Sequence, residues 1–162
     1  MVYAVTNPLI GSQPIADTST TQNHPFGTKV SAYDPTYGEG EFVYLKGVAS
    51  TVVGSWVTIN YDDSTTTLLA ANAIGPVGVA MSINDAATDY GWYQIRGKAS
   101  AQAAASFAND GRVYTASAGV VDDAVVDGDM VHNALGASTI TDAGLADFEI
   151  QYPYTDDIAG ND

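Results

Sequence analysis

Short runs of β-prone residues alternate with clusters of glycine, asparagine, aspartate and serine, most regularly between residues 38 and 83. Runs of β-branched and aromatic residues that are bounded by turn-forming residues are typical of strands. The runs in this region are residues 41–46, 56–59 and 77–81. The pattern therefore predicts a compact all-β domain.

Glycines mark the starts of several predicted strands. Gly54, Gly111 and Gly128 are each followed by one polar residue and then two apolar residues. Glycine gives the chain the φ freedom of a turn before the chain extends. Because an aspartate precedes Gly111 and Gly128, these two positions are the sharpest turn signals in the sequence. We expect the strands to form a small barrel-like scaffold.

Other segments also have strand character. Residues 90–98 are rich in aromatic side chains, and residues 146–152 alternate apolar with polar side chains at period two, which indicates a half-buried strand. Residues 98–108 are rich in alanine, which favours a helix, although small side chains also suit a continuing strand. We favour the strand there because the signals that start and stop helices are poor.

The first 40 residues differ from the remainder of the chain. Four of the six prolines lie here, in a segment rich in serine, threonine, glutamine and asparagine. Proline removes a backbone donor and pushes its predecessor toward extended geometry, so neither a helix nor a central strand is expected. We predict an extended N-terminal arm at residues 1–40, a β-rich domain at 41–154 and a flexible acidic tail at 155–162. The alternative for residues 1–40 is a terminus without fixed structure.

The composition is strongly acidic. The 162 residues, 46% of them hydrophobic, suffice for one domain with a core, and five Lys and Arg face 19 Asp and Glu, for a formal net charge of −14. Such a surface repels nucleic acid and anionic lipid, so we expect no nucleic-acid and no membrane partner. It favours a partner that presents Lys and Arg. Because cysteine is absent, disulfides, zinc–thiolate sites and thiol catalysis are excluded.

The N-terminal residues contain no basic leader and no apolar run of signal-peptide length, and no later window has the length needed to cross a bilayer. We therefore expect a protein that is made and kept on the cytosolic side, or released by lysis.

The polar residues form no motif of catalysis or metal binding. His24 and His132 lack the partner spacing of a zinc motif, and we expect them to be solvated or to cap backbone groups. The acidic run 122–129 fails as a calcium loop, because Ala134 stands where the bidentate glutamate belongs. Nucleophile-elbow and phosphate-loop motifs are also missing. We expect no enzyme activity, no catalytic residue, no cofactor and no metal.

The aromatic residues allow two interpretations. Trp56, Tyr90, Trp92 and Tyr93 could form a platform on which sugar rings stack, with acidic residues nearby to bind the hydroxyl groups. Aromatic residues in strands more often lie in the core or anchor an interface. We favour the core or interface role, and the sugar platform stays open as the alternative.

Several of the predicted strands together resemble a known family. Residues 42–47 form a strand that ends in glycine, residues 54–57 read Gly-x-x-Val, residues 74–80 read Ile-Gly-x-x-Gly-Val-Ala, and residues 94–99 read Gln-Ile-Arg-Gly-Lys-Ala. Over residues 38–115 this pattern resembles the head decoration, or cement, proteins of tailed bacteriophages. Residues after about 120 match no such pattern, which leaves a second subdomain or a swapped strand open.

The resemblance implies a small β-barrel or β-tulip-like fold, a homotrimer, and a position on the capsid exterior in the virion. There the protein would clamp neighbouring subunits of the major capsid protein. A trimer whose arms bind together gains on the order of 10²-fold or more in avidity. The candidate capsid and subunit interface residues are Pro8, Leu9, Ile10, Pro14, Ile15, Phe26, Trp56, Trp92 and Tyr93.

Two other functions stay open at this point. The first is a carbohydrate-binding module on the virion surface that uses the same aromatic and acidic residues. The second is a small hydrolase with the acid pair Asp62 and Asp63, which we expect at the tip of a hairpin. The hydrolase ranks last because the sequence offers this pair no basic or metal partner.

Overall fold

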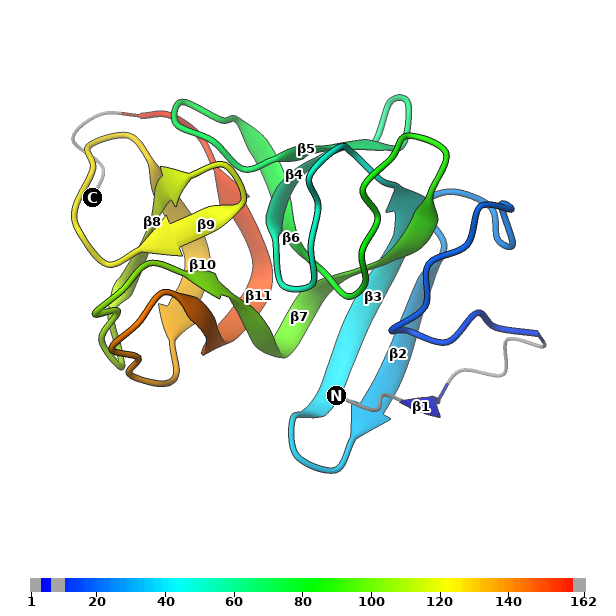
Figure 1. The fold of residues 1–162 in the computed structure, drawn as a ribbon, viewed down its shortest axis with the longest axis horizontal. Coiled ribbons are helices and arrows are strands. Elements are labelled where there is room, and N and C mark those ends of the chain that lie inside the picture. The colour runs from blue at the N-terminus through cyan, green and yellow to red at the C-terminus, as the bar shows by residue number, and fades with distance from the viewer. Residues whose placement is uncertain (1–3, 7–10, 159–162) are drawn as a thin grey trace.

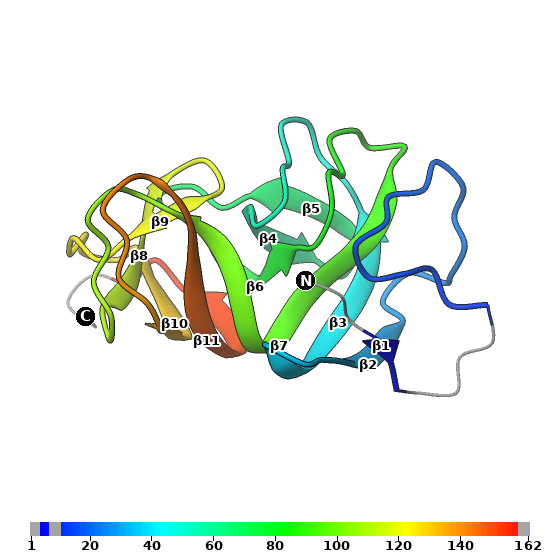
Figure 2. The same ribbon diagram turned by 60° about the horizontal axis from the view of Figure 1, so that its bottom comes forward.

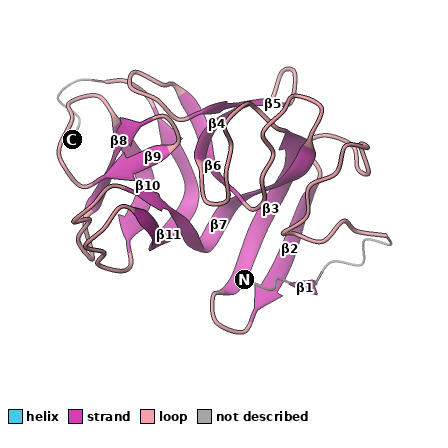
Figure 3. Ribbon diagram, in the orientation of Figure 1, coloured by secondary structure: helices cyan, strands magenta, loops and turns pink. Residues whose placement is uncertain are grey.

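The computed structural model describes residues 4–6 and 11–158, and within these residues it contains strands and no helix (Figure 3). The all-β prediction is confirmed. The strands are β1 (Ala4–Val5), β2 (Lys29–Asp34), β3 (Gly38–Lys46), β4 (Trp56–Asn60), β5 (Thr65–Leu68), β6 (Gly75–Ala80), β7 (Tyr90–Ala103), β8 (Arg112–Ser117), β9 (Val120–Asp122), β10 (Met130–Gly136) and β11 (Gly144–Thr155). In this part of the chain, no helix of membrane-spanning length and apolarity occurs.

The longest strand, β7, is shared by two groups of strands. Its first half pairs with β3 and β6, and its second half pairs antiparallel with β11. A ring of strands runs from β7 through β11, β10, β8 and β9 and returns to β7, where Ala103 pairs with Val121. Strands β2 to β6 form the other half of the molecule, with β7 running between the two halves (Figures 1 and 2).

A bend at Gly97 allows β7 to serve both groups. Gly97 has φ +102°, and a Cβ atom there would lie 2.5 Å from the carbonyl oxygen of Glu39 in β3. The side-chain amide of Gln94, which is fully buried, donates to the carbonyl oxygens of Arg96 at 3.1 Å and Lys98 at 3.0 Å. These bonds cross the bend and satisfy two backbone acceptors beside it.

Strand β3 is buried on both faces. Side chains alternate across a strand, so neighbouring residues of β3 pack into different clusters. Phe42 and Tyr44 pack on one face, while Val43 and Leu45 pack on the other against β4, β6 and β7. This explains why residues 42–45 are a continuous apolar run.

The alanine-rich segment continues β7 as a strand through Ala103, and residues 104–108 form a turn and loop. The prediction of a strand is confirmed for residues 98–103. Three alanines, at 99, 101 and 103, point into the ring of strands, where larger rings fill the core. Phe148 meets Trp56 and Phe107 edge-on, with centroids 5.1 and 5.0 Å apart. Small side chains on β7 leave room for these rings.

The segment expected as an extended arm differs in the structure. β2 lies within it and pairs with β3 along its whole length, and the predicted boundary at residue 40 falls inside β3. Residues 11–28 lie against the domain, where Ser19 pairs with Tyr90 of β7 and Ile15 is buried. Buried Val30 and Ala32 alternate with neighbours that are exposed or half-buried, and this period-two pattern is the strand signal that the prolines obscured.

The last strand and one hairpin lie where the sequence predicts them, but the last strand ends later than predicted. Asp62 and Asp63 lie in the tight turn between β4 and β5, so the hairpin-tip prediction is confirmed. β11 extends beyond residue 152 to Thr155, and residues 156–158 follow it, while residues 159–162 of the expected tail lie outside the described residues.

Gly97→Ala is expected to lower the free energy of unfolding by about 3 kcal/mol, because alanine combines a left-handed φ with a backbone clash. Urea or guanidinium denaturation measures this change. Gly144→Ala is the matched control, because a Cβ atom there meets nothing within 4 Å, and we expect a change within about 0.5 kcal/mol. Equal midpoints for the two variants would contradict the role of Gly97.

Candidate functional site

The aromatic residues singled out in the sequence lie in the core. Trp56, Trp92 and Tyr93 are each 0% exposed. The indole N–H of Trp56 donates to the carbonyl of Gln102 at 3.2 Å, and burial raises the pKa of Tyr93 to about 12. None of the three presents a ring face on which a sugar could stack, so they act as core residues.

The remaining interface candidates do not gather into one surface. Ile15 is buried in the same cluster as Trp92, Phe26 is half-buried beside Tyr90, and Pro14 is exposed. Trp56 and Tyr93 belong to two other core clusters. Pro8, Leu9 and Ile10 lie outside the described residues.

Gln13 is the centre of a buried polar network that fixes the N-terminal segment over β3 and β7. Its carbonyl accepts from the indole N–H of Trp92 at 3.0 Å, and its side-chain oxygen accepts from Tyr44 at 3.1 Å and Asn23 at 2.9 Å. Its backbone N–H donates to Nε2 of His24 at 3.0 Å. Gln13 thus bonds to the domain through Trp92 and Tyr44 and within the segment through Asn23 and His24, which favours one docked arrangement.

His24 is packed, and of the two alternatives expected for the histidines it takes the second, the capping of a backbone group. It is 7% exposed and lies edge-on to Tyr44, with centroids 5.0 Å apart. It does cap a backbone group, that of Gln13. Burial lowers the pKa of His24 from its ordinary value of 6.5.

The acidic residues are used locally. Asp63 accepts from the backbone N–H of Thr65 at 3.1 Å and from its hydroxyl at 2.6 Å, and these bonds lower the pKa of Asp63. Asp123 accepts from the N–H of Ala108, and Asp129 accepts from the N–H of Asn72. Across residues 4–6 and 11–158, no group of three or more His, Asp or Glu is placed to hold a metal ion.

Exposed tyrosines gather at one hollow on the surface, which we call the tyrosine groove. It has a volume of about 250 Å³ and lies where β11 pairs with β6. The tyrosines that line it are 41–46% exposed, whereas its floor is buried. The lining residues are Tyr61, Pro76, Val77, Ile95, Tyr152, Pro153 and Tyr154.

An irregularity in β11 creates the groove. Before it, Phe148 and Ile150 are buried; after it, Pro153 and Thr155 are buried, so the inward phase of the strand changes by one residue. The pairing register with β10 shifts over the same stretch, and Tyr152 has φ +51°. A bulge re-aims side chains and accommodates proline, which cannot donate to a sheet ladder. Both tyrosines that flank Pro153 are exposed as a result.

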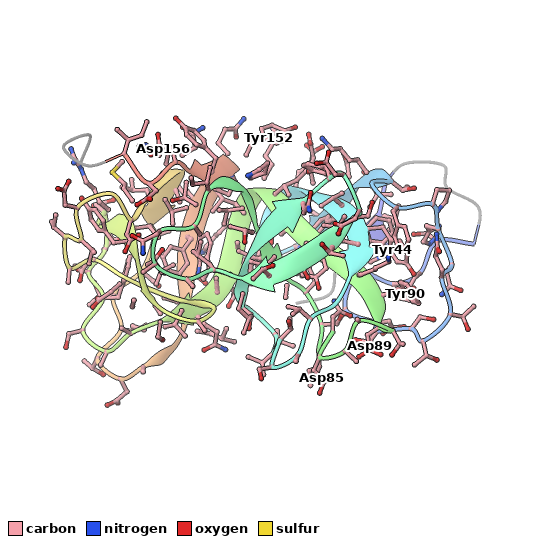
Figure 4. The ribbon with its side chains drawn as sticks, turned by 90° about the horizontal axis from the view of Figure 1, so that it is seen from above. Tyr44, Asp85, Asp89, Tyr90, Tyr152 and Asp156 are labelled. Atoms are coloured by element: carbon pink, nitrogen blue, oxygen red, sulfur yellow. The ribbon has the colours of Figure 1, made fainter. Side chains whose placement is uncertain are left out.

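Contacts hold the rings of the groove in place. The Tyr152 hydroxyl donates to Glu41, and Lys29 lies over the Tyr152 ring at 5.8 Å from its centroid. Tyr154 stacks on His132 with centroids 4.7 Å apart, and Nε2 of His132 is 3.3 Å from Oδ1 of Asp156. Tyr152 and Asp156 lie along the same edge of the molecule (Figure 4).

A second hollow of about 430 Å³ adjoins the tyrosine groove and shares Tyr61 and Pro76 with it. Ile74, at 71% exposed, and Thr58 and Thr67 of β4 and β5 are also part of its wall. The two hollows together form a continuous surface across β5, β4, β6 and β11, in which the tyrosine groove is the apolar part and the second hollow is mixed. Surfaces of this kind mark sites of interaction with other molecules.

Most cationic side chains of the chain contact a carboxylate or an aromatic ring of the same chain. Arg96 pairs with Glu41 at 3.3 Å, and Lys98 pairs with Asp147 at 2.8 Å, a bond that raises the pKa of Lys98. The ammonium of Lys46 lies 5.1 Å from the centroid of Phe26. Since the chain carries only five Lys and Arg, most carboxylates are left to give the surface a strong negative field.

Sequence reasoning missed the groove. The segment Gln151-Tyr152-Pro153-Tyr154 contains the signal, because two tyrosines around a proline near the end of a strand favour a bulge with exposed rings. Tyr61 directly precedes the hairpin-tip pair Asp62 and Asp63 and carries no separate signal in the sequence.

No family model, characterised protein or solved structure matches this chain.

The stability of the protein is expected to fall as the pH drops through about 6.5, partly because of His24. The unfolded chain binds a proton at this histidine more readily than the folded chain, whose His24 accepts the Gln13 N–H and has a lowered pKa. Denaturation of the wild type and of His24→Gln from about pH 8 to about pH 5 measures the effect. The wild type should lose more stability than the variant, and parallel curves would show that His24 contributes nothing.

Proposed function

We propose that this protein is a structural virion protein that binds the outside of a phage capsid and stabilises it by clamping neighbouring major capsid protein subunits. In this proposal it acts as a homotrimer, is made in the host cytoplasm, and performs no catalysis. The observation that carries the proposal is the exposed tyrosine and proline surface on a rigid, extensively paired sheet.

The composition of this surface supports a protein partner. Tyrosine is enriched at protein interfaces because it combines a large apolar ring with a polar tip and loses little conformational entropy on binding. Tyr61, Tyr152 and Tyr154 supply such rings at one place, and Ile74 extends the apolar area. The sheet beneath them is paired on several sides, so the surface changes little when a partner binds.

The charge of the chain supports a basic partner. A net charge of −14 steers association with surfaces rich in Lys and Arg and disfavours nucleic acid. A trimer that presents three copies of one surface to a symmetric shell gains avidity from simultaneous contacts. Modest contact area in each copy is then sufficient.

Deletion of the docked N-terminal segment is not a suitable test of the proposal. Removing residues 2–30 would take away Ile15 and Gln13 and uncover Trp92, so such a truncation would unfold part of the core. The proposal therefore rests on the tyrosine surface and not on a free arm. A carbohydrate ligand would likewise need rings other than Trp56, Trp92 and Tyr93, which are enclosed.

The full-length protein is expected to bind purified heads of its virus that were assembled without it. Co-sedimentation should be saturable, and the bound protein should raise the temperature at which the heads release their DNA. In solution, light scattering should give three times the 16.8 kDa mass of one chain. A monomer that is absent from purified virions and leaves the heads unbound would overturn the proposal.

A further inference from the structure

The tyrosine groove has the chemistry of a site for an extended, proline-containing segment. Its walls are tyrosine rings and its floor is formed by Val77, Ile95 and Pro153, so the lining offers apolar faces and few polar atoms. Polyproline II segments dock into aromatic-lined grooves of this kind, because their prolines stack on rings and their backbone needs no ladder partners. A volume of about 250 Å³ suits a few residues of such a segment.

Four carboxylates lie close in sequence to two of the tyrosines that line the groove. Asp62 and Asp63 directly follow Tyr61, and Asp156 and Asp157 come directly after Thr155 at the end of β11. Asp62, Asp63 and Asp157 are exposed, and Asp156 already lies near the ring stack of His132 and Tyr154. These charges complement a cationic ligand and would speed its association.

The side of the groove at Tyr152 carries the opposite charge. Lys29 lies over the Tyr152 ring, whereas the charge of Arg96 is balanced by Glu41, which also accepts from the Tyr152 hydroxyl. A positive residue of the ligand is therefore favoured at the side of Tyr61 and Tyr154 and disfavoured at the side of Tyr152. The charge pattern therefore favours one orientation of the ligand along the groove.

We infer that the tyrosine groove binds a proline-containing extended segment of a partner protein that carries Lys or Arg at one end. The inference deepens the proposed function and rests on it, since the major capsid protein would supply the segment. It names the chemistry that is recognised, namely proline rings against tyrosine rings and a cation against the carboxylates.

The test uses the full-length protein and an array of short fluorescent peptides with proline at every third position and a terminal arginine. Fluorescence polarisation should detect binding of these peptides. Peptides with alanine in place of each proline, or glutamate in place of arginine, should bind at least about tenfold more weakly. Raising the salt concentration should weaken only the part of the binding affinity that depends on the arginine.

Variants of the groove make the test specific. Tyr61→Ala removes a ring with 46% exposure and should weaken binding about tenfold, whereas Tyr61→Phe keeps the ring and should retain binding. Tyr33→Ala is the matched control, because Tyr33 is a 50% exposed tyrosine on β2 that does not line the groove. Asp62→Lys should weaken the binding of the arginine-containing peptide by about threefold.

The outcomes separate this inference from the proposed function. If no peptide binds and Tyr61→Ala decorates heads as well as the wild type, the groove inference is wrong while decoration stands. If the peptides bind in the expected way but the protein does not bind heads, the proposed capsid decoration is wrong while the inferred specificity of the groove stands. Binding of soluble oligosaccharides in place of peptides, or a loss of oligomer mass in Tyr61→Ala without peptide binding, would assign the groove another occupant and overturn the inference.

Discussion

The bend of β7 at Gly97 is the constraint on which the rest of the molecule depends. One strand must pair with β3 and β6 in its first half and with β11 in its second, and Gly97 lies where the pairing passes from one set of partners to the other. A residue with a side chain is strained at the bend, because its Cβ atom would lie 2.5 Å from the carbonyl oxygen of Glu39 in β3. The side-chain amide of Gln94 donates to two backbone acceptors around the bend, while its own Oε1 is buried without a hydrogen-bond partner, so the bend leaves one buried polar atom unsatisfied among the described residues. The two halves therefore share one continuous ladder and form a single cooperative unit.

The same strand also explains why the N-terminal segment is part of the domain. Alternate residues of β3 and β7 point to a second face, where Tyr44 and Trp92 would be exposed without a cover. Residues 11–28 supply that cover, and Gln13 satisfies the polar tips of both rings. Proline-rich sequence does not prevent this, because the segment is held by side-chain and isolated backbone bonds and needs no regular ladder.

Much of the fold could be predicted from the sequence, because strand formation depends on local pattern. The apolar runs at residues 41–46, 56–59 and 77–81 and the alternation near the C-terminus all became strands. The docking of residues 11–28 could not be predicted, since it depends on which faces of distant strands are left uncovered. The tyrosine groove was missed for a related reason. The side to which Tyr152 and Tyr154 point depends on a bulge in pairing with β10, and period-two reasoning assumes that no bulge occurs.

The position of that bulge links the scaffold to binding. β11 pairs with β7, β10 and β6, so the backbone that carries Tyr152 and Tyr154 is held from several directions. Ring contacts to His132 and the bond to Glu41 then fix the side chains that are exposed. A surface that is ordered before its partner arrives loses little entropy on association, so more of the contact energy appears as affinity. This economy matters for a small acidic domain, because each copy offers only a limited apolar area and must depend on rigidity and repetition to hold a partner.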